Sequence, residues 1–529
     1  MCTVVVAPGV AEEAAVVVRD ALASLGLQLN RTKTKVWTQD PEFVPPSGLA
    51  PYKCDRLTLL GSEVPWLDRD EGELDAPLHD RADGALAIQE ARRLVARVGE
   101  LRGAGLSARA AFLILQTYGQ SCVNHLQRAN YENGDWEDVL DGVLMQGLET
   151  LLETGLGADG RTLAGLRLKD GGIAYGGLKR RSAEAYLASW ALTFHEVVGL
   201  IGIESLEGFR TRCLALSATM AEAETALLAE LDGSARGRPL DWHAFFREPR
   251  SKLQGVWGQE SSSNRREALL QTLGDDVAAE VRERGGVSAG SFLLLLAEGA
   301  AVMPDAHFLT ALRDRLLLPV CEEGACCNHR RPDGRLCGAY LDARGRHARM
   351  CGIGGGYVAR HNRIRDWAAA THAACTGLPA STEQRVPEWD RLDPQTGVLE
   401  AAVLDVAFSD PRTGRRLLGD VVVKSAFSQN AATLRGRARR DGLAAAEAAA
   451  AKRRRYPLGG PSLVPLAFES GGRPGEDTIG FVRQCGAAWA ALHGEDSVEM
   501  KLSTGKLWQE VSTLLQLGNA ELILSANGR

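Results

Sequence analysis

The sequence has no apolar run long enough to cross a membrane. Its longest uninterrupted apolar stretch is six residues, 292–297, whereas a membrane-spanning helix needs roughly 20. The N-terminus, MCTVVVAPGVAEE, has neither a basic start nor a long apolar segment, so we expect no secretory signal peptide. The sequence also has no internal repeat.

The cysteines lack the usual C-x-x-C pair, but they are clustered. Of 11 cysteines, five fall between Cys321 and Cys351. In a chain without an export signal, such a cluster indicates metal ligands before disulfides. Four residues supply a CCHC set for a tetrahedral zinc ion: Cys327, Cys337, His347 and Cys351. Three neighbours are alternative ligands: Cys321, Cys326 and His329. The opposing interpretation is a group of unligated cysteines and ordinary histidines.

A basic segment lies inside an acidic chain. Residues 343–456 contain 20 lysines and arginines but only 11 acidic residues, although the whole chain has a net charge of −6. Such a segment favours a polyanion as its partner. An ordinary solvated, arginine-rich face is the alternative.

Helical periodicity dominates the first 320 residues. Residues 12–25 predict an amphipathic helix, and apolar residues at three- and four-residue spacings continue from about 77 to 231. Residues 321–357 are rich in Cys, His and Gly, and beyond them helix and strand patterns alternate to about residue 493. We therefore expect an α+β or α/β multidomain chain.

Residues 398–425 contain two apolar runs separated by DPRTGRR, which predicts an antiparallel hairpin. Pairing about the turn places Phe408 opposite Leu417 and Asp405 opposite Asp420. Both strands are apolar on both faces and should be buried. Two buried acids repel each other, and a divalent cation such as Mg²⁺ would resolve the conflict.

Lys424 lies four residues beyond Asp420 and thus on the same strand face. Two acids, a metal and a lysine form the equipment for phosphodiester hydrolysis, because the metal activates water and the lysine steadies an oxyanion. Alternatively, one aspartate lies at a strand edge in solvent, or a one-residue slip sends the two to opposite faces.

The flanking segments predict an α-β-β-β-α-β-α order. The elements in sequence are helix 358–375, strand 381–389, the two hairpin strands, helix 431–456, strand 463–468 and helix 476–493. The first helix has a basic side suited to phosphates, and the first strand carries Glu383, a possible third acid.

Together these features resemble the C-terminal region of non-LTR retrotransposon proteins that carry a restriction-like endonuclease. That family places a CCHC module before an R-H-N or R-H-D motif, here residues 360–362, and then a PD-(D/E)xK-type core. Asp405 matches its first aspartate, without the usual proline, and Asp420 matches its second. The family's lysine often lies near a K-x-x-K-Y pattern, which Lys452 begins here, so Lys424 and Lys452 both remain candidates.

The resemblance also implies a set of nucleic-acid contacts: Arg360, His361, Asn362, Arg363, Arg365 and Arg455. The N-terminal part resembles the end of a reverse transcriptase, with the late palm at 26–34, the primer-grip hairpin at 57–62 and thumb helices around 110–128. The family's catalytic aspartate pair would precede Met1, so we expect no polymerase activity.

The resulting expectation is a DNA-nicking enzyme with structural Zn²⁺ and catalytic Mg²⁺, located in the nucleus, with DNA and possibly the element's RNA as partners. The alternative is a catalytically inert nucleic-acid-binding remnant. The expected segments are a palm remnant 1–65, thumb-like helices 66–235, a helical linker 236–320, the zinc module 321–357, the endonuclease domain 358–493 and a tail 494–529.

Overall fold

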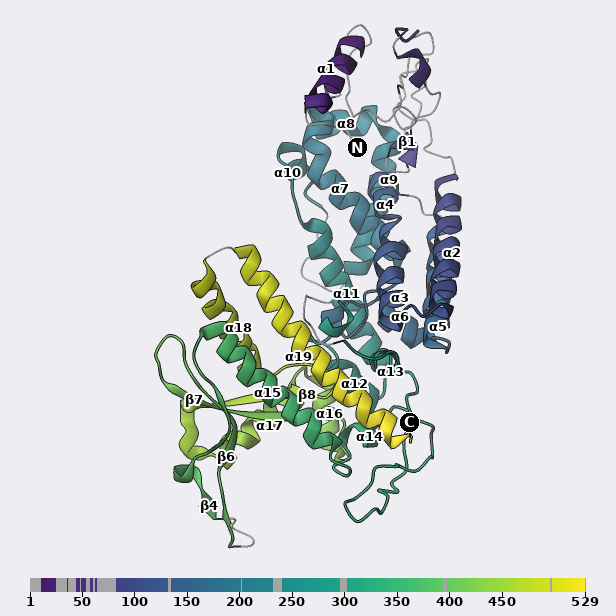
Figure 1. Ribbon diagram of the computed structural model, residues 1–529. Helices are drawn as coiled ribbons and strands as arrows, with labels where there is room; N and C mark the ends of the chain where they lie inside the picture. Colours follow the sequence, from purple (N-terminus) through teal and green to yellow (C-terminus); the bar gives the residue numbers. More distant parts are fainter. Residues whose placement is uncertain are drawn as a thin grey trace. The chain divides into compact units, whose positions relative to one another are not determined.

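The protein has a mixed α+β fold in which helices dominate and a small sheet lies in the C-terminal part (Figure 1). The fold is taken from a computed structural model. It describes residues 11–24, 36, 44–47, 49–53, 58–59, 62–63, 82–131, 135–200, 202–231, 240–294, 302–392, 397–494 and 497–528. Within these residues, no helix has both the length and the hydropathy required to cross a bilayer.

The chain divides into two compact units. The first comprises residues 1–90, 121–139 and 179–256. Its helices include α1 (Ala11–Ser24), α4 (Asn124–Ala129), α7 (Leu178–Leu200), α8 (Leu206–Arg212), α9 (Leu214–Leu231) and α10 (Trp242–Arg247). Aromatic rings fill its core; for example, the ring centroids of Phe194 and Phe209 lie 4.9 Å apart.

The reverse-transcriptase-like segments of this unit are only partly described. The predicted helix 12–25 is confirmed as α1. A short antiparallel hairpin of β1 (Thr58–Leu59) and β2 (Ser62–Glu63) lies where the resemblance implied one. The predicted palm motif at 26–34 lies outside the described residues.

The second unit comprises residues 91–120, 140–178 and 257–529. The helices before its sheet include α3 (Ala108–Ile114), α6 (Ala158–Gly165), α12 (Asp275–Glu283), α13 (Asp305–Arg315), α14 (Arg346–Met350) and α15 (Gly356–Thr376). Three further helices extend across the sequence limits of the units: α2 (Ala82–Gly103), α5 (Trp136–Leu152) and α11 (Leu253–Thr272).

A four-stranded sheet forms the centre of this unit. Its strands are β3 (Ser381–Arg385), β6 (Val403–Ser409), β7 (Arg416–Lys424) and β8 (Leu463–Glu469), in the order β3-β6-β7-β8. The first three are antiparallel, and β8 is parallel to β7. The pairing Phe408↔Leu417 confirms the predicted hairpin register, which is set by burial of apolar residues on both strands.

Helices cover both faces of the sheet. Helix α15, α18 (Glu476–His493) and α19 (Ser497–Ala526) share one apolar core with residues of β6, β7 and β8. On the opposite face, α17 (Leu443–Arg455) packs small alanines against β8. Figure 1 shows α15, α18 and α19 lying together beside the strands.

Several details differ from the sequence expectation. The strand predicted for 381–389 ends at Arg385, because Pro387, which has no N–H for a strand ladder, begins a short 3-10 turn. The single helix predicted for 431–456 is wrong, because Gly442, at a φ of 71°, separates α16 (Ala431–Arg439) from α17. This positive φ suits glycine, which has no Cβ to clash with the backbone. A small hairpin of β4 (Arg391–Leu392) and β5 (Leu399–Glu400) is also inserted before β6.

Candidate metal centres

The four predicted zinc ligands converge. The ligand atoms of Cys327, Cys337, His347 and Cys351 all lie within 4.8 Å of one another. The Cys337 Sγ is 3.4 Å from the His347 Nε2 and 3.7 Å from the Cys351 Sγ. Three thiols and an imidazole at this spacing are the donor set that zinc prefers, so this Cys₃His cluster could bind a metal such as zinc.

The alternative ligands have other partners or point elsewhere. Cys326 is exposed, although its neighbour Cys327 is fully buried. The Nε2 of His329 hydrogen bonds the Ser525 hydroxyl at 2.7 Å, and the Cys321 Sγ accepts a hydrogen bond from Asn527. These contacts tie the cysteine-rich segment to the end of α19.

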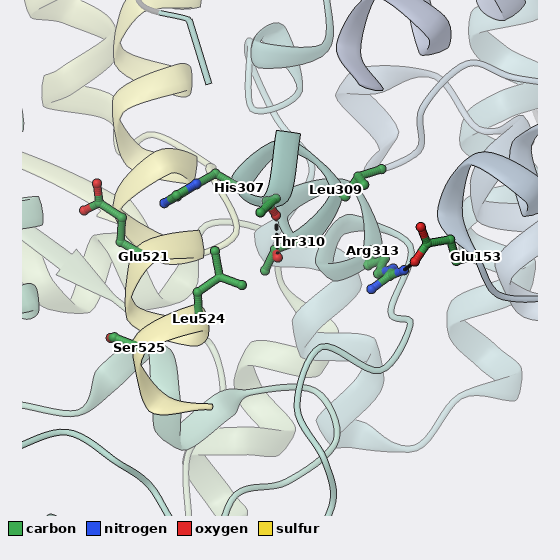
Figure 2. Close-up of a pocket in the computed structure, with 9 residues that line it drawn as sticks. Glu153, His307, Leu309, Thr310, Arg313, Glu521, Leu524 and Ser525 are labelled. Atoms are coloured by element: carbon green, nitrogen blue, oxygen red, sulfur yellow. Dashed lines mark hydrogen bonds and ion pairs between the residues drawn. The ribbon is translucent and has the colours of Figure 1, made fainter. Parts of the chain in front are cut away.

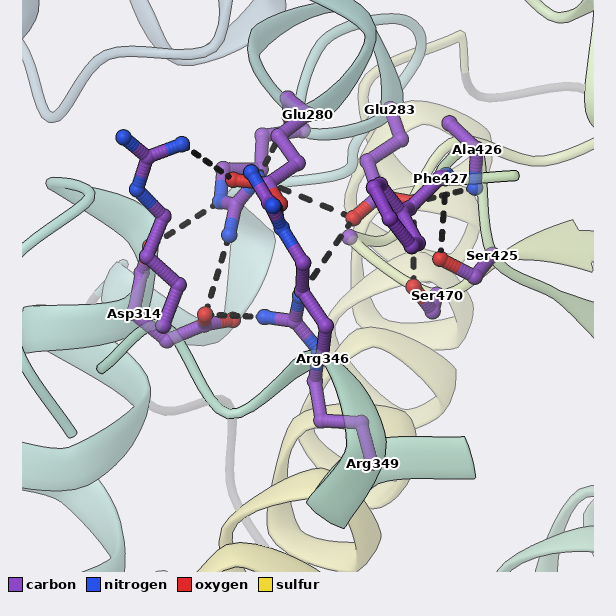
Figure 3. A network of polar contacts seen from close by, with 12 residues as sticks. Glu280, Glu283, Asp314, Arg346, Arg349, Ser425, Ala426, Phe427 and Ser470 are labelled. Atoms are coloured by element: carbon purple, nitrogen blue, oxygen red, sulfur yellow. Dashed lines mark hydrogen bonds and ion pairs between the residues drawn. The ribbon is translucent and has the colours of Figure 1, made fainter. Parts of the chain in front are cut away.

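A buried network of charges surrounds α14, the short helix that carries His347 (Figure 3). Arg346 pairs with Glu280, and Arg349 pairs with Asp314. Glu283, on α12, accepts hydrogen bonds from the Ala426 N–H at 2.8 Å and the Ser470 hydroxyl at 3.0 Å. Those two residues follow β7 and β8, so the network links the segment that carries the Cys₃His cluster to the ends of two sheet strands.

The two predicted acids, Asp405 and Asp420, lie on neighbouring strands. The β6–β7 register places them opposite each other, one pair beyond Val406↔Gly419. Asp420 is only 4% exposed, and its Oδ2 has no hydrogen-bond partner among the described residues. A buried carboxylate oxygen without a donor is costly, and a cation is one way to satisfy it.

Lys452, near the C-terminal end of α17, reaches the acid pair. Its Nζ donates a 2.8 Å hydrogen bond to the Asp420 Oδ1. Burial raises the pKa of Asp420 to about 6; Lys452 opposes this rise and Asp405 adds to it. Lys424 is exposed, and within the described chain it has no hydrogen bond to either aspartate. Of the two candidate lysines, the structure therefore brings Lys452 to the acids.

His361 contacts the other acid. Its Nε2 lies 3.1 Å from the Asp405 Oδ2, which also accepts the Val421 N–H at 2.7 Å. Burial would raise the pKa of Asp405, but hydrogen bonding to His361 and Asp420 holds it below its usual value. The Asp405 carboxylate in turn raises the pKa of His361. The His361 Nδ1 faces the Asn362 Oδ1 at 3.3 Å.

The possible third acid, Glu383, does not turn toward the pair. It lies at the register position opposite Asp405 on β3, with a φ of 53°. Its carboxylate is 68% exposed and accepts a 2.6 Å hydrogen bond from Arg365. Two carboxylates, rather than three, thus face each other at this centre.

The predicted basic face of α15 is not a row of free cations. Arg360 is only 1% exposed and donates to the Asn519 side chain and the Arg349 carbonyl, so its placement among surface phosphate contacts was wrong. Arg363 forms a bidentate ion pair with Glu521. Arg455 is partly exposed and stacks over the Tyr456 ring. The sequence pattern predicted only a weak amphipathic helix in the tail 494–529, whereas α19 is a long helix that packs against this side of α15.

A separate pocket of about 550 Å³ lies between α13 and α19 and contains none of the predicted site residues (Figure 2). Its arginine, Arg313, donates to the Leu152 carbonyl, and Glu521 is held by Arg363. Arg313 and Glu521 thus have structural partners, whereas the buried Nδ1 of His307, which also lines the pocket, has none among the described residues.

The contact between His361 and Asp405 was missed by the sequence analysis, which assigned this histidine to phosphate binding. Helical spacing was the available signal, because His361, Ile364 and Ala368 recur at intervals of three and four residues. Ile364 and Ala368 are fully buried.

In the comparisons with known proteins, no family model matches this chain and no curated protein matches it significantly.

Proposed function

We propose that this protein is a metal-dependent DNA endonuclease with a structural zinc site, derived from a non-LTR retrotransposon. The single observation that carries the proposal is the buried Asp405–Asp420 pair, in which Lys452 binds one acid and one oxygen of Asp420 has no donor among the residues that the structure describes. A divalent cation there would bind a scissile phosphate and activate water. Lys452 would stabilise charge on the attacking or leaving oxygen.

The surroundings of this pair agree with the proposal. The order α15, β3, β6, β7, α17, β8 and α18 is the one expected for a restriction-like endonuclease core, with α16 and the β4–β5 hairpin as additions. Although much of the positive charge on α15 is paired, Arg412, Arg416 and Arg454 of the basic segment 343–456 are exposed and supply positive charge for a DNA backbone. The nick would free a 3′-hydroxyl, which in the proposed family primes reverse transcription.

Nicking of supercoiled plasmid tests this function. The zinc-loaded protein should convert supercoiled to open-circular DNA in Mg²⁺ but not in a magnesium-free buffer. Asp420→Asn removes the charge but preserves the shape, and should abolish nicking. Glu388→Gln is a matched control, because Glu388 is an exposed acid of the same region. Nicking that persists in Asp420→Asn would refute the assignment.

The alternative is a nucleic-acid-binding remnant without catalysis. The observation that favours it is the position of Glu383, whose carboxylate is paired with Arg365 and leaves only two acids at the centre. DNA binding by the wild-type protein in a gel-shift assay, without nicking in Mg²⁺ or Mn²⁺, would support this alternative.

A further inference from the structure

Four carboxylate oxygens surround the proposed cation site, and the protein itself engages two of them. The Asp420 Oδ1 accepts from Lys452, and the Asp405 Oδ2 accepts from both His361 and the Val421 N–H. The Asp420 Oδ2 has no donor among the described residues. The side chains of Asp405 and Asp420 interact with each other, which two carboxyl groups can do only by sharing a proton. A divalent cation would take the place of that proton and contact one oxygen of each aspartate.

His361 is oriented to donate a proton rather than to bind a metal. Because a carboxylate only accepts hydrogen bonds, the Nε2 that faces the Asp405 Oδ2 at 3.1 Å must carry the hydrogen. A protonated ring nitrogen has no lone pair for a metal. The second nitrogen, Nδ1, faces the Asn362 Oδ1 rather than the acids. Thus neither nitrogen is available at the acid pair.

The helix that carries His361 is firmly anchored. Its neighbour Arg360 is buried and bonds both Asn519 on α19 and the Arg349 carbonyl on α14. Ile364, one turn further along α15, is fully buried in the core against the sheet. The imidazole therefore approaches Asp405 from a rigid support, and it can hold that carboxylate in one rotation about its side chain.

We propose that His361 is a positioning residue, which holds Asp405 so that one oxygen of each aspartate is left for a single divalent cation. This inference rests on the proposed function only in taking the bound cation to serve DNA cleavage. The cation site itself can be tested without DNA. A cation held by two protein oxygens keeps several coordination positions for water and for the oxygens of a phosphate.

The test measures Mn²⁺ binding to the full-length, zinc-loaded chain, with bound and free Mn²⁺ distinguished by electron paramagnetic resonance. The wild type should bind one Mn²⁺ per chain that is lost in Asp420→Asn. His361→Ala should weaken this binding by roughly 10–100-fold, the range seen when the residue orienting a metal ligand is removed. His361→Gln should restore most of the affinity, because its amide N–H can donate to the same oxygen. His243→Ala, at an exposed histidine, is the matched control.

Several outcomes would overturn the proposal. Unchanged Mn²⁺ affinity in His361→Ala would show that the histidine does not position Asp405. An equal loss in His361→Gln and His361→Ala, with zinc content and thermal melting unchanged, would make the imidazole itself a ligand. Two bound Mn²⁺ ions, or none, in the wild type would contradict a single site.

Failure of this inference can be told from failure of the endonuclease proposal. A wild type that binds one Mn²⁺ in the expected order of variants but never nicks DNA would remove the nuclease and leave the positioning role. If the wild type nicks DNA and His361→Ala keeps the same activity and Mn²⁺ affinity, the positioning role is removed and the endonuclease proposal remains.

Discussion

The two candidate metal centres differ in what holds their ligands. The Cys₃His ligands come from a segment in which Cys326–Tyr340 and Arg330–Leu336 are isolated β-bridges and the regular structure is limited to the short helix α14. Asp405 and Asp420 instead lie on strands of a sheet covered by helices on both faces. In the first centre a metal would complete the fold, whereas in the second the sheet would hold the two acids in place before any metal binds.

The largest effect should follow from loss of a zinc ligand. Structural zinc contributes on the order of 10 kcal/mol of binding free energy, so Cys327→Ser should release the metal and expose residues 321–351 to protease. Cys326→Ser is a matched control, because this adjacent cysteine is exposed. Zinc content by mass spectrometry and limited proteolysis provide the measurements. Equal zinc retention in both variants would contradict the assigned ligand set.

The next effect is catalytic and concerns the two lysines. Removal of one preorganised charge that stabilises a transition state typically slows a reaction by roughly 10²–10³-fold, and we expect this from Lys452→Ala. Lys424→Ala, at an exposed position on β7, should leave the nicking rate nearly unchanged. Single-turnover nicking rates in Mg²⁺ compare the two. A slower Lys424→Ala enzyme with a normal Lys452→Ala enzyme would reverse the assignment.

The contrast also explains what could be predicted from sequence. The hairpin register followed from local signals, because the turn DPRTGRR joins two short apolar runs and pairing about its centre sets which residues face each other. The Cys₃His cluster followed from residue type and spacing. Both features depend on segments close in the chain, where elementary geometry limits the choices.

The remaining features depend on tertiary packing. From the sequence alone, Arg360 was predicted to be a surface cation. In the structure it is buried and donates to Asn519, which lies 159 residues later in the chain. Likewise, Glu383 was predicted to be a possible third acid, but in the structure its carboxylate accepts a hydrogen bond from Arg365. Neither partner could be inferred from periodicity, because α19 carries only a weak pattern and ion pairing leaves no spacing signal.

A smaller effect is expected from magnesium on stability. A ligand present at 100 times its dissociation constant stabilises the native state by about 2.7 kcal/mol, so Mg²⁺ should raise the melting temperature of the zinc-loaded protein by several degrees. The sheet should remain folded without Mg²⁺, as judged by hydrogen exchange of β6 and β7. Asp420→Asn should abolish the shift. Unfolding of the sheet in magnesium-free buffer would erase the distinction between the two centres.

The smallest effect concerns an ion cluster that holds the α16–α17 junction without any metal. The Asp441 carboxylate forms ion pairs with three arginines. Its oxygens lie 2.6 Å from a guanidinium nitrogen of Arg266, 2.8 Å from one of Arg282 and 3.3 Å from one of Arg473. Burial would raise the pKa of Asp441, but these arginines lower it to about 2. Because the folded-state pKa lies below the ordinary value of 3.8, the pair stabilises the fold fully above pH 3.8 and progressively less as the pH falls toward 2.

Asp441→Asn should therefore lower the free energy of unfolding near pH 6 by on the order of 1 kcal/mol, a value reduced by the partial solvent exposure of the carboxylate. The deficit relative to wild type should shrink as the pH is lowered to 3, measured by urea unfolding at each pH. Acid also protonates the zinc ligands, but it does so in both proteins, so the difference between them isolates Asp441. A deficit that stays constant with pH would mean that Asp441 acts through packing or neutral hydrogen bonds rather than through its charge.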